Sequence, residues 1–367
     1  MEFRDRGLPL GVVSISRIRT NIEAMAGRAG KHNLLFRPHF KTHQSAGIGE
    51  LFRNHTNAVT VSSPGMGLYF ARRGWRRITM AFPVNAHDAQ ALRELAIAAN
   101  TDFLVSSPEA VGALDGALRG VPAGVWIKVD CGYRRAGIPW DDADALSVTG
   151  ESIGLRRNMA FRGILTHAGN TYSAGNRHGI LEVHRQSLER MAEAKKSVGG
   201  GCLVSVGDTP SCSVAESFPG VDEIRPGNFV FHDATQLELG SCGPGEIAFA
   251  VLCPVAEVHR DRTVILGGAI HLSRDSTPSG CFGYAGASSE DGFFEPLAQH
   301  PVTMISQEHG VVKGVPPGSE PGSVIPVIPA HSCLAAGCFP VYLDEEGNRL
   351  ERYGPTRRAG SNADRSC

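Results

Sequence analysis

The sequence predicts an α/β protein in which a (β/α)8 barrel, residues 9–240, precedes a mainly β domain, residues 241–367, to which residues 1–8 are also assigned. Three observations lead to this prediction. Eight short apolar runs occur in the first 240 residues, helical patterns lie between many of them, and helical periodicity fades afterwards. Eight strands that mostly alternate with helices favour a barrel over an open doubly wound sheet, which remains the alternative.

The eight apolar runs have the length and composition of buried strands. They are Gly11–Ser14, Leu34–Phe40, Ala58–Ser62, Ile78–Phe82, Thr101–Val105, Val125–Val129, Phe161–Leu165 and Cys202–Val206. Helical spacing separates several of them. Ile18, Ile22 and Met25 share one helical face before the stop signal Gly30, and the same spacing recurs in residues 92–99 and 181–192.

The last third of the chain has a different character. Strand-like segments are separated by stretches rich in Gly, Pro and Ser, notably Val315–Ser323, and no convincing helical period is present. The tail Arg357–Cys367 is predicted to fray. The strand-like segments are Ala248–Val258, Arg262–Leu266, Val302–Ile305 and Pro340–Leu343.

The bulk composition narrows the class of function. With 42% hydrophobic residues, 20% charged residues and a net charge of −1, nothing suggests a nucleic-acid or membrane partner. No run of about 18 apolar residues and no signal peptide is seen. The nine cysteines are odd in number and form no CxxC pair, which indicates reduced thiols in a cytoplasmic protein.

Lys41 follows the second apolar run, with His39 before it and His43 after it. Burying an ammonium is costly, so a lysine at the end of a buried strand favours the neutral amine, which can form a Schiff base. The alternative is that Lys41 simply leaves the strand into solvent. A barrel predicts that functional residues cluster just after the strands, where Ser63, Asp130 and His167 also lie.

Two glycine turns and an arginine pair offer anion-binding groups. The loop Val206–Ser211 follows the eighth apolar run and could present backbone amides and hydroxyls to a phosphate, although it also fits an ordinary turn and helix cap. Asp208 would repel a phosphate unless it points away. Arg225–Asn228 forms a second such turn. Arg134 and Arg135 end another strand and could bind an anionic oxygen, or lie in a surface turn.

His331 and Cys333 are two residues apart. In an extended segment such side chains share a face, and imidazole with thiolate suits zinc. Two ligands make only half of a metal site. The alternative is therefore that Cys333 is a buried thiol beside a structural histidine.

Together these pieces resemble the fold type III pyridoxal-phosphate enzymes, in the branch of D-serine dehydratases and D-threonine aldolases. That branch has an alanine-racemase-like barrel followed by a β domain, and the resemblance covers nearly the whole chain in matching order. Arg37–His43 looks like the Schiff-base lysine signature R-P-H-x-K-T-H. The resemblance implies Lys41 and Tyr172 as catalytic residues. It implies as cofactor-binding residues Lys41, His39, Arg135, His167, Tyr172, Gly207, Thr209, Arg225, Gly227 and Asn228.

The resemblance also extends to the metal and the substrate. His331-Ser332-Cys333 resembles the His-x-Cys zinc pair of eukaryotic D-serine dehydratases, where aldolases have His-x-Asp for manganese or magnesium. Ser306–Gly310 resembles a substrate-proximal segment, which implies weaker roles for Glu308 and His309. Gln44 stands where a second lysine is frequent, and Gly267–Asp275 matches the usual D-x-G-x-K-x-x-S-x-D stretch only loosely.

The resemblance therefore implies a pyridoxal-phosphate- and metal-dependent lyase acting on β-hydroxy-D-amino acids, most closely a D-serine dehydratase. Aldol cleavage to glycine and an aldehyde is the alternative, followed by a racemase or a non-catalytic cofactor-binding protein. A homodimer with shared active sites is also implied, since in this family the β domain of one subunit closes the barrel of the other.

Overall fold

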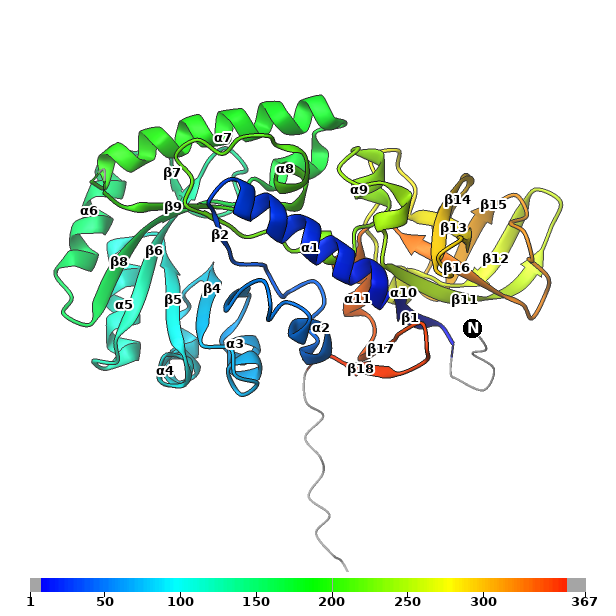
Figure 1. Cartoon of the computed structure of the whole chain (residues 1–367), viewed down its shortest axis with the longest axis horizontal. Helices are drawn as coiled ribbons and strands as arrows, with labels where there is room; N and C mark the ends of the chain where they lie inside the picture. Colours follow the sequence, from blue (N-terminus) through cyan, green and yellow to red (C-terminus); the bar gives the residue numbers. More distant parts are fainter. Residues whose placement is uncertain (1–7, 200, 355–367) are drawn as a thin grey trace, which may run out of the picture.

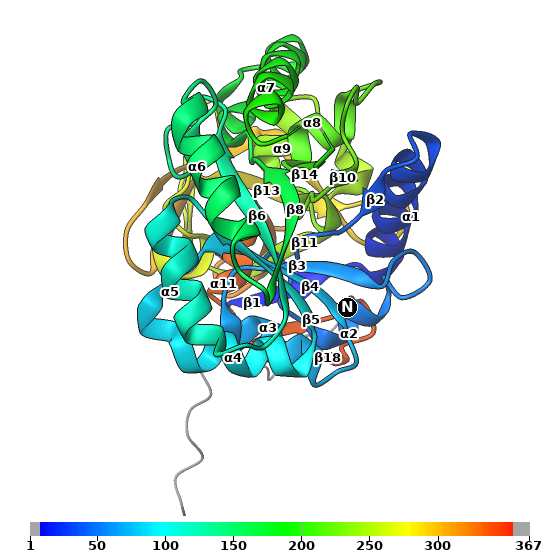
Figure 2. The same cartoon turned by 90° about the vertical axis from the view of Figure 1, so that its left-hand side faces the viewer.

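A parallel sheet of eight strands wrapped by helices forms the first part of the molecule, seen in the computed structural model of residues 8–199 and 201–354 (Figures 1 and 2). Its strand order is β2-β10-β9-β8-β6-β5-β4-β3. Beyond β2, His39 bridges to Thr60 of β3, and the Phe40 N–H donates to the Thr60 carbonyl at 2.9 Å. This bridge brings the two edges together, which confirms the predicted barrel.

The barrel strands are β2 Leu35–Phe36, β3 Ala58–Val61, β4 Arg77–Pro83, β5 Asn100–Val105, β6 Ala123–Asp130, β8 Met159–Leu165, β9 Leu203–Val206 and β10 Glu223–Ile224, with β7 Ile138–Pro139 beside β6. The helices around them are α1 Ile15–Lys31, α2 Ala46–Glu50, α3 Pro64–Ala71, α4 Ala89–Ala98, α5 Pro108–Leu118, α6 Ala143–Gly154, α7 Arg177–Ser197, α8 Thr209–Val214 and α9 Ala234–Glu238. Short 3₁₀ turns are η1 Ala86–Asp88, η2 Gly169–Ser173, η3 Asn228–Val230 and η4 Pro244–Glu246.

Local sequence signals explain where several barrel helices begin. The side chains of Ser63 and Ser107 each accept a hydrogen bond from the backbone three residues later, and proline follows each serine at the first helical position. In α1, Ile18, Ile22 and Met25 are buried, as their spacing predicts.

One strand assignment from the sequence is wrong. Gly11–Ser14 was counted as a barrel strand, but β1, Leu10–Val13, pairs antiparallel with β11 and parallel with β17 in the second sheet. The eighth barrel strand is β10, Glu223–Ile224, which is too short to stand out as an apolar run. A buried strand has the same apolar pattern in either sheet, so the pattern cannot reveal its partners.

The second sheet is mostly antiparallel and has the order β12-β15-β14-β13-β16-β11-β1-β17-β18. An additional pairing of β12 with β11 closes six of these strands into a small barrel, and β1, β17 and β18 continue from β11. The predicted mainly β fold is thus confirmed, while the division after residue 240 stays a prediction. The bounds are β11 Phe249–Val258, β12 Arg262–Leu266, α10 Ala269–Leu272, β13 Gly283–Ser288, β14 Phe294–Ile305, β15 His309–Lys313, β16 Val324–Pro329, α11 Ser332–Gly337, β17 Val341–Leu343 and β18 Arg349–Glu351.

Buried polar contacts fix the β domain against the barrel. Arg17 of α1 donates to both carboxylate oxygens of Asp291 at 2.6 and 2.8 Å, and also to the carbonyls of Ile247 and Phe294 at 2.8 and 3.0 Å. The Tyr342 hydroxyl of β17 donates to the carbonyl of His43 at 2.9 Å, two residues after Lys41. These contacts hold one wall of the site described below at a fixed position relative to the other.

Two predictions about the chain ends, for residues 1–7 and the tail after 354, fall outside the described residues. The eight cysteines within the described ranges are free thiols. Within those ranges, no helix has both the length and the apolar character that crossing a membrane requires.

Candidate active site

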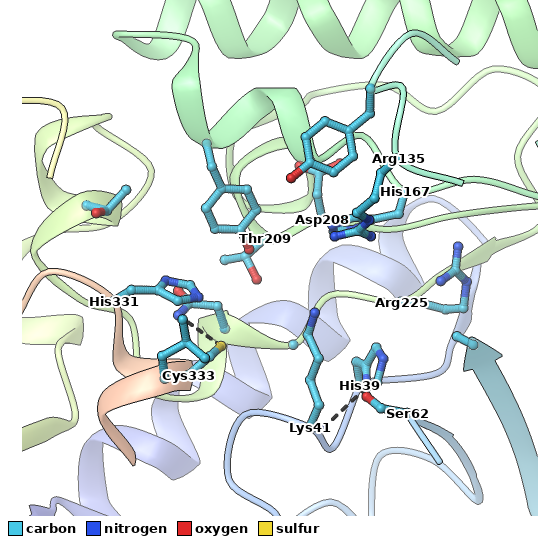
Figure 3. A pocket seen from close by; sticks show the side chains of 18 of the residues that line it. His39, Lys41, Ser62, Arg135, His167, Asp208, Thr209, Arg225, His331 and Cys333 are labelled. Carbon is cyan, nitrogen blue, oxygen red and sulfur yellow. Dashed lines mark hydrogen bonds between the residues drawn. The ribbon is translucent and has the colours of Figure 1, made fainter. Parts of the chain in front are cut away.

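A cavity of about 880 Å³ lies between the carboxyl ends of the barrel strands and the β domain (Figure 3). Eleven of the predicted site residues line it together. They are His39, Lys41, Arg135, His167, Tyr172, Thr209, Arg225, Gly227, Asn228, His331 and Cys333. Most of these residues directly follow β2, β6, β8, β9 or β10. This is the position that a barrel predicts for functional residues.

Lys41 extends into the middle of this cavity, with Cys333 to one side and Arg225 to the other (Figure 3). Its loop is anchored by Phe40, whose buried ring packs against Phe52 and Trp75 at centroid distances of 5.0 and 5.2 Å. Burial lowers the pKa of Lys41, and the charges of Arg135 and Arg225 lower it further, against the opposing effect of Cys333. The amine is therefore more readily neutral and nucleophilic than an exposed lysine.

The two histidines around Lys41 have different surroundings. The Lys41 N–H donates to Nδ1 of His39 at 3.3 Å, so the proton of the neutral ring lies on Nε2. Burial, followed by the charges of Lys41 and Arg225, holds the pKa of His39 well below its ordinary value. His43 instead packs among aromatic rings, 4.6 Å from Phe40, and is part of the core.

His167 and Tyr133 form the wall on the β8 side. His167 Nδ1 lies 2.5 Å from the Gly207 carbonyl, which fixes the ring, and burial then nearby Lys41 keep its pKa well below the usual range. The Tyr133 ring meets His167 edge-on at 6.2 Å, and Arg135 lies 4.8 Å over the face of Tyr133. A flat aromatic ligand can lie against this wall.

Two glycines beside this wall allow neighbouring loops to pack closely against each other. A Cβ on Gly207 would lie 2.9 Å from the Arg225 carbonyl oxygen, and one on Gly227 would lie 3.0 Å from the His39 carbonyl oxygen. Thr209 and Asn228 begin short helical turns, whose first N–H groups have no partner within the turn. The N–H groups at the start of these two turns, at Thr209 and Asn228 on the cavity wall, are donors that suit a phosphate.

The Asp208 carboxylate is held by hydrogen bonds within its own part of the site. Its Oδ1 accepts from the Ser211 N–H at 2.6 Å and from the Thr171 hydroxyl at 3.0 Å, so the carboxylate caps α8. The sequence left open whether Asp208 would repel a phosphate, and these bonds explain how the loop accommodates an acidic residue.

His331 and Cys333 lie on the side of the cavity opposite Arg225, with Lys41 between them (Figure 3). His331 Nδ1 lies 3.2 Å from the buried Asp233 carboxylate, which leaves its other ring nitrogen available. Cys333 Sγ lies 3.1 Å from the Thr42 hydroxyl and 3.6 Å from the Asn228 amide. Only His331 is extended, since Cys333 lies in the first turn of α11, so the extended-segment premise of the prediction is wrong although the side chains still meet.

The electrostatics of this pair favour metal binding. Burial alone would raise the pKa of Cys333, but the His331 charge and hydrogen bond, with help from Lys41, lower it. A thiolate is the form that binds metal. Among the described residues, no group of three or more His, Cys, Asp or Glu side chains has metal-holding geometry. His331 and Cys333 would therefore supply two protein ligands to a metal.

Tyr172 stands next to this pair. Its ring meets the His331 ring edge-on at a centroid distance of 5.9 Å, and burial raises its pKa well above the ordinary value. Its hydroxyl therefore stays protonated and acts as a donor.

Three predicted site residues, Gly207, Glu308 and His309, do not line the cavity of their own chain. Gly207 lies just before the lining residues Asp208 and Thr209, whereas Glu308 and His309 are in the β domain. Glu308 ends the turn between β14 and β15, and its side chain accepts a hydrogen bond from Gln307. His309 begins β15 and is exposed. Their predicted contact with substrate is therefore not made within one chain.

Sequence reasoning missed three groups at the site. Asp233 orients His331. The sequence feature that could have identified Asp233 is the helix-capping pattern Asp233-Ala234-Thr235-Gln236. Arg274 lines the cavity from the β domain. Lys128 is buried within β6, where a lysine inside an apolar strand was a readable signal.

Lys128→Met is expected to flatten the pH dependence of the unfolding free energy. Burial, then the Arg225 charge, lowers the Lys128 pKa from 10.5 to about 7. Between these values the unfolded chain binds one proton more, so stability rises with pH by about 1.4 kcal/mol per unit. Urea unfolding at pH 7, 8 and 9 should show this slope lost in Lys128→Met and kept in Lys31→Met, whose lysine is exposed. Equal slopes in the two variants would contradict the prediction.

Comparisons with known proteins agree with the geometry. A family model described as alanine racemase, N-terminal domain, matches residues 13–235, and one described as putative serine dehydratase domain matches residues 248–343. The D-threo-3-hydroxyaspartate dehydratase of Delftia sp. strain HT23 is 28% identical over 91% of this chain and 93% of that protein. The D-serine dehydratase of Dictyostelium discoideum is 28% identical over 97% of this chain and 98% of that protein.

Solved structures give the same result. The Delftia dehydratase superposes with a TM-score of 0.85 at 25% identity, covering 95% of this chain and 98% of that one. A cysteine variant of that dehydratase is described as its metal-free form. The D-threonine aldolase of Filomicrobium marinum shares the fold, with a TM-score of 0.82 at 18% identity over 94% of each chain. The predicted branch of D-serine dehydratases and D-threonine aldolases is confirmed.

Proposed function

Because the chain belongs to the family of the alanine racemase N-terminal domain, we propose that it is a pyridoxal-phosphate-dependent lyase that converts a β-hydroxy-D-amino acid into a keto acid and ammonia. The observation that carries this proposal is the placement of Lys41 and the His331–Cys333 pair on the walls of one cavity. One wall supplies an amine of lowered pKa and the other supplies metal ligands.

The residues present fit both groups. Lys41 would hold the cofactor through its amine, the wall of His167 and Tyr133 would flank the ring, and the turns at Gly207 and Gly227 would take the phosphate. His331 and Cys333 would hold a divalent metal, with zinc favoured by the thiolate over manganese or magnesium. Pyridoxal phosphate, when bound, withdraws electrons from the α-carbon of the substrate.

The protein side chains then have different roles in the reaction. The Lys41 amine takes the proton from the α-carbon, a role that its lowered pKa permits. The β-hydroxyl is held at the His331–Cys333 wall, where a metal would ease its departure as water. Tyr172, protonated beside His331, can donate a hydrogen bond there. Loss of the α-proton and the β-hydroxyl leaves an enamine, which tautomerises and hydrolyses to the keto acid and ammonia.

A product assay tests this proposal. Metal- and cofactor-loaded protein is incubated with D-serine, D-threonine and D-threo-3-hydroxyaspartate, with their L-forms as controls. Keto acid and ammonia in equal amounts, from D-forms alone, are expected. Glycine with an aldehyde would identify a retro-aldol lyase instead. Formation of the opposite enantiomer alone would indicate a racemase, and no product from any substrate would leave only cofactor binding.

We also propose a cytoplasmic homodimer with shared sites. Glu308 and His309 lie outside the cavity of their own chain, so a role in the reaction requires a second copy. Apolar Ile270, Met304 and Leu334 are exposed on the same β domain, at 49, 61 and 54%. Light scattering measures the molar mass of the particle in solution, which should be that of two chains. Co-expression of Lys41→Ala and Glu308→Ala chains should restore activity that neither variant has alone if sites are shared.

A further inference from the structure

We propose that Arg274 binds a second carboxylate on the substrate, one attached to the β-carbon, so that a β-hydroxy-D-amino dicarboxylic acid is preferred over D-serine. This inference deepens the proposed function and rests on it for the reaction. Elimination from such a substrate would give a 2-oxo dicarboxylic acid and ammonia. Arg274 was not singled out by the sequence, because the segment that contains it matches the family pattern only loosely.

The charge of the cavity wall favours a ligand with several negative charges. Its lysines and arginines outnumber its carboxylates by five to two. A cofactor phosphate and one α-carboxylate do not use all of these cations. The five are Lys41, Lys128, Arg135, Arg225 and Arg274, and the two carboxylates are Asp208 and Asp275.

Four of the five cations already have a partner or a role. Arg225 donates to the Ser205 hydroxyl at 2.6 Å and lies 3.8 Å from the Glu223 carboxylate. Arg135 lies over Tyr133, the Lys128 amine donates to the Val129 carbonyl at 3.1 Å, and Lys41 is assigned to the cofactor. The Arg274 side chain has no hydrogen bond or ion pair within the described residues, and it is exposed where it lines the cavity. Arg135 also has no hydrogen bond or ion pair among the described residues, but it lies over Tyr133 on the barrel side, so Arg274 is the cation that the β domain offers to an incoming anion.

Arg274 lies on the wall where the β-substituent would be. Helix α10, which ends just before it, packs against α11, the helix whose first turn carries Cys333. A substrate whose β-hydroxyl is held by the His331–Cys333 pair presents its remaining β-substituent to this same wall. The α-carboxylate is attached to the α-carbon, which lies near Lys41. It is therefore one bond farther from the Arg274 wall than the β-substituent is.

The Arg274 loop is held in place before any ligand binds. Ser273 has a φ of +68°, a conformation that residues other than glycine rarely adopt and that the surrounding structure must hold in place. The Asp275 N–H donates to the Ser273 hydroxyl at 3.3 Å, and the Ser273 N–H donates to the Ala269 carbonyl at 3.0 Å. Farther along, the Ser279 N–H and the Tyr284 hydroxyl donate to Glu238 of α9 at 2.8 and 2.6 Å. Fixing a guanidinium in advance reduces the entropy lost on binding.

Asp275 sets a limit on the site. Its carboxylate lies 3.5 Å from the Ser273 hydroxyl and also lines the cavity. A like charge disfavours a carboxylate that approaches from its side, so the ligand carboxylate is expected to bind the face of the guanidinium away from Asp275. Arg274→Lys should therefore restore little, because a lysine cannot bind a carboxylate through two parallel N–H bonds.

The test compares kcat/KM for D-threo-3-hydroxyaspartate and D-serine in the wild type, Arg274→Gln and Arg274→Lys. Losing a hydrogen-bonded charge should lower the value for the dicarboxylate by about 10- to 100-fold in Arg274→Gln, while D-serine changes by less than about threefold. Arg19→Gln, which removes an exposed arginine from α1, should change neither value. An equal loss for both substrates, or no loss for either, would overturn the proposal.

A binding measurement separates this inference from the proposed reaction. D-aspartate and D-alanine carry no β-hydroxyl, so neither can lose water. Calorimetry on the cofactor-loaded wild type should show D-aspartate binding about 10-fold or more tightly than D-alanine, with the difference lost in Arg274→Gln. This result would support the carboxylate site even if the lyase assay failed. Equal affinities in the wild type would reject the site even if the lyase assay succeeded.

Discussion

Lys41→Ala is expected to lower turnover of β-hydroxy-D-amino acids by about 10²- to 10⁴-fold, the range for losing a positioned proton-transfer group. The same change removes the amine that would hold the cofactor, so the bound-cofactor absorbance should disappear on desalting. Both effects follow from one side chain, because Lys41 is the cavity lysine made nucleophilic by burial without lying inside a strand. Lys128, the other cavity lysine, is held within β6.

Borohydride reduction followed by peptide mass spectrometry identifies the attachment site. Reduced cofactor is expected on the Lys41 peptide in the wild type and nowhere in Lys41→Ala, whereas Lys31→Ala, at the exposed end of α1, should behave as the wild type. Attachment to Lys128, or a Lys41→Ala protein that keeps its cofactor absorbance and full turnover, would contradict the assignment.

Removing either ligand of the His331–Cys333 pair is expected to abolish metal binding and to lower turnover by about 10²-fold or more, since a metal acting as a Lewis acid supplies several kcal/mol. His331→Ala and Cys333→Ala should each show this loss. Asp233→Asn should act more mildly, lowering metal affinity by about 10- to 100-fold, because Asp233 orients His331 without being a ligand. Metal analysis of the purified proteins gives the content per chain.

A chelator experiment completes this test. Dialysis against a chelator should inactivate the wild type, and zinc should restore it better than manganese or magnesium because the site contains a thiolate. Cys338→Ala, which removes an exposed thiol from the end of the same helix, is the matched control and should keep its metal. Activity that is indifferent to the chelator would remove the metal from the mechanism.

Much of the fold and the site could be predicted from local patterns. The helical spacing of Ile18, Ile22 and Met25 identified α1, and the alternation of apolar runs with helices identified the barrel. The motif around Lys41 identified one of the two lysines that line the cavity, and the loops at Gly207 and Gly227 were found by their turn chemistry. Such signals are readable because they depend on residues close together in the chain.

The errors concern contacts between distant segments. β1 has the pattern of a barrel strand but pairs with β11, about 240 residues later. The role of Glu308 stays a prediction, because its turn lies outside the cavity of its own chain and could meet substrate only in a second copy. Asp233 and His331 are separated by nearly 100 residues and meet only after folding. No periodicity or motif reports which strand or side chain a residue will contact at that range.

The sequence by itself determined that the chain forms a barrel and a β domain, and that Lys41, His331 and Cys333 are its most reactive candidates. Only the tertiary structure decided that these three groups share one cavity, that Asp233 orients the metal pair and that Arg274 faces the same space. The physical reason is that folding brings charges from separate segments together away from water. Burial and nearby arginines then lower the pKa of Lys41. His331 lowers the pKa of Cys333, although burial alone would raise it.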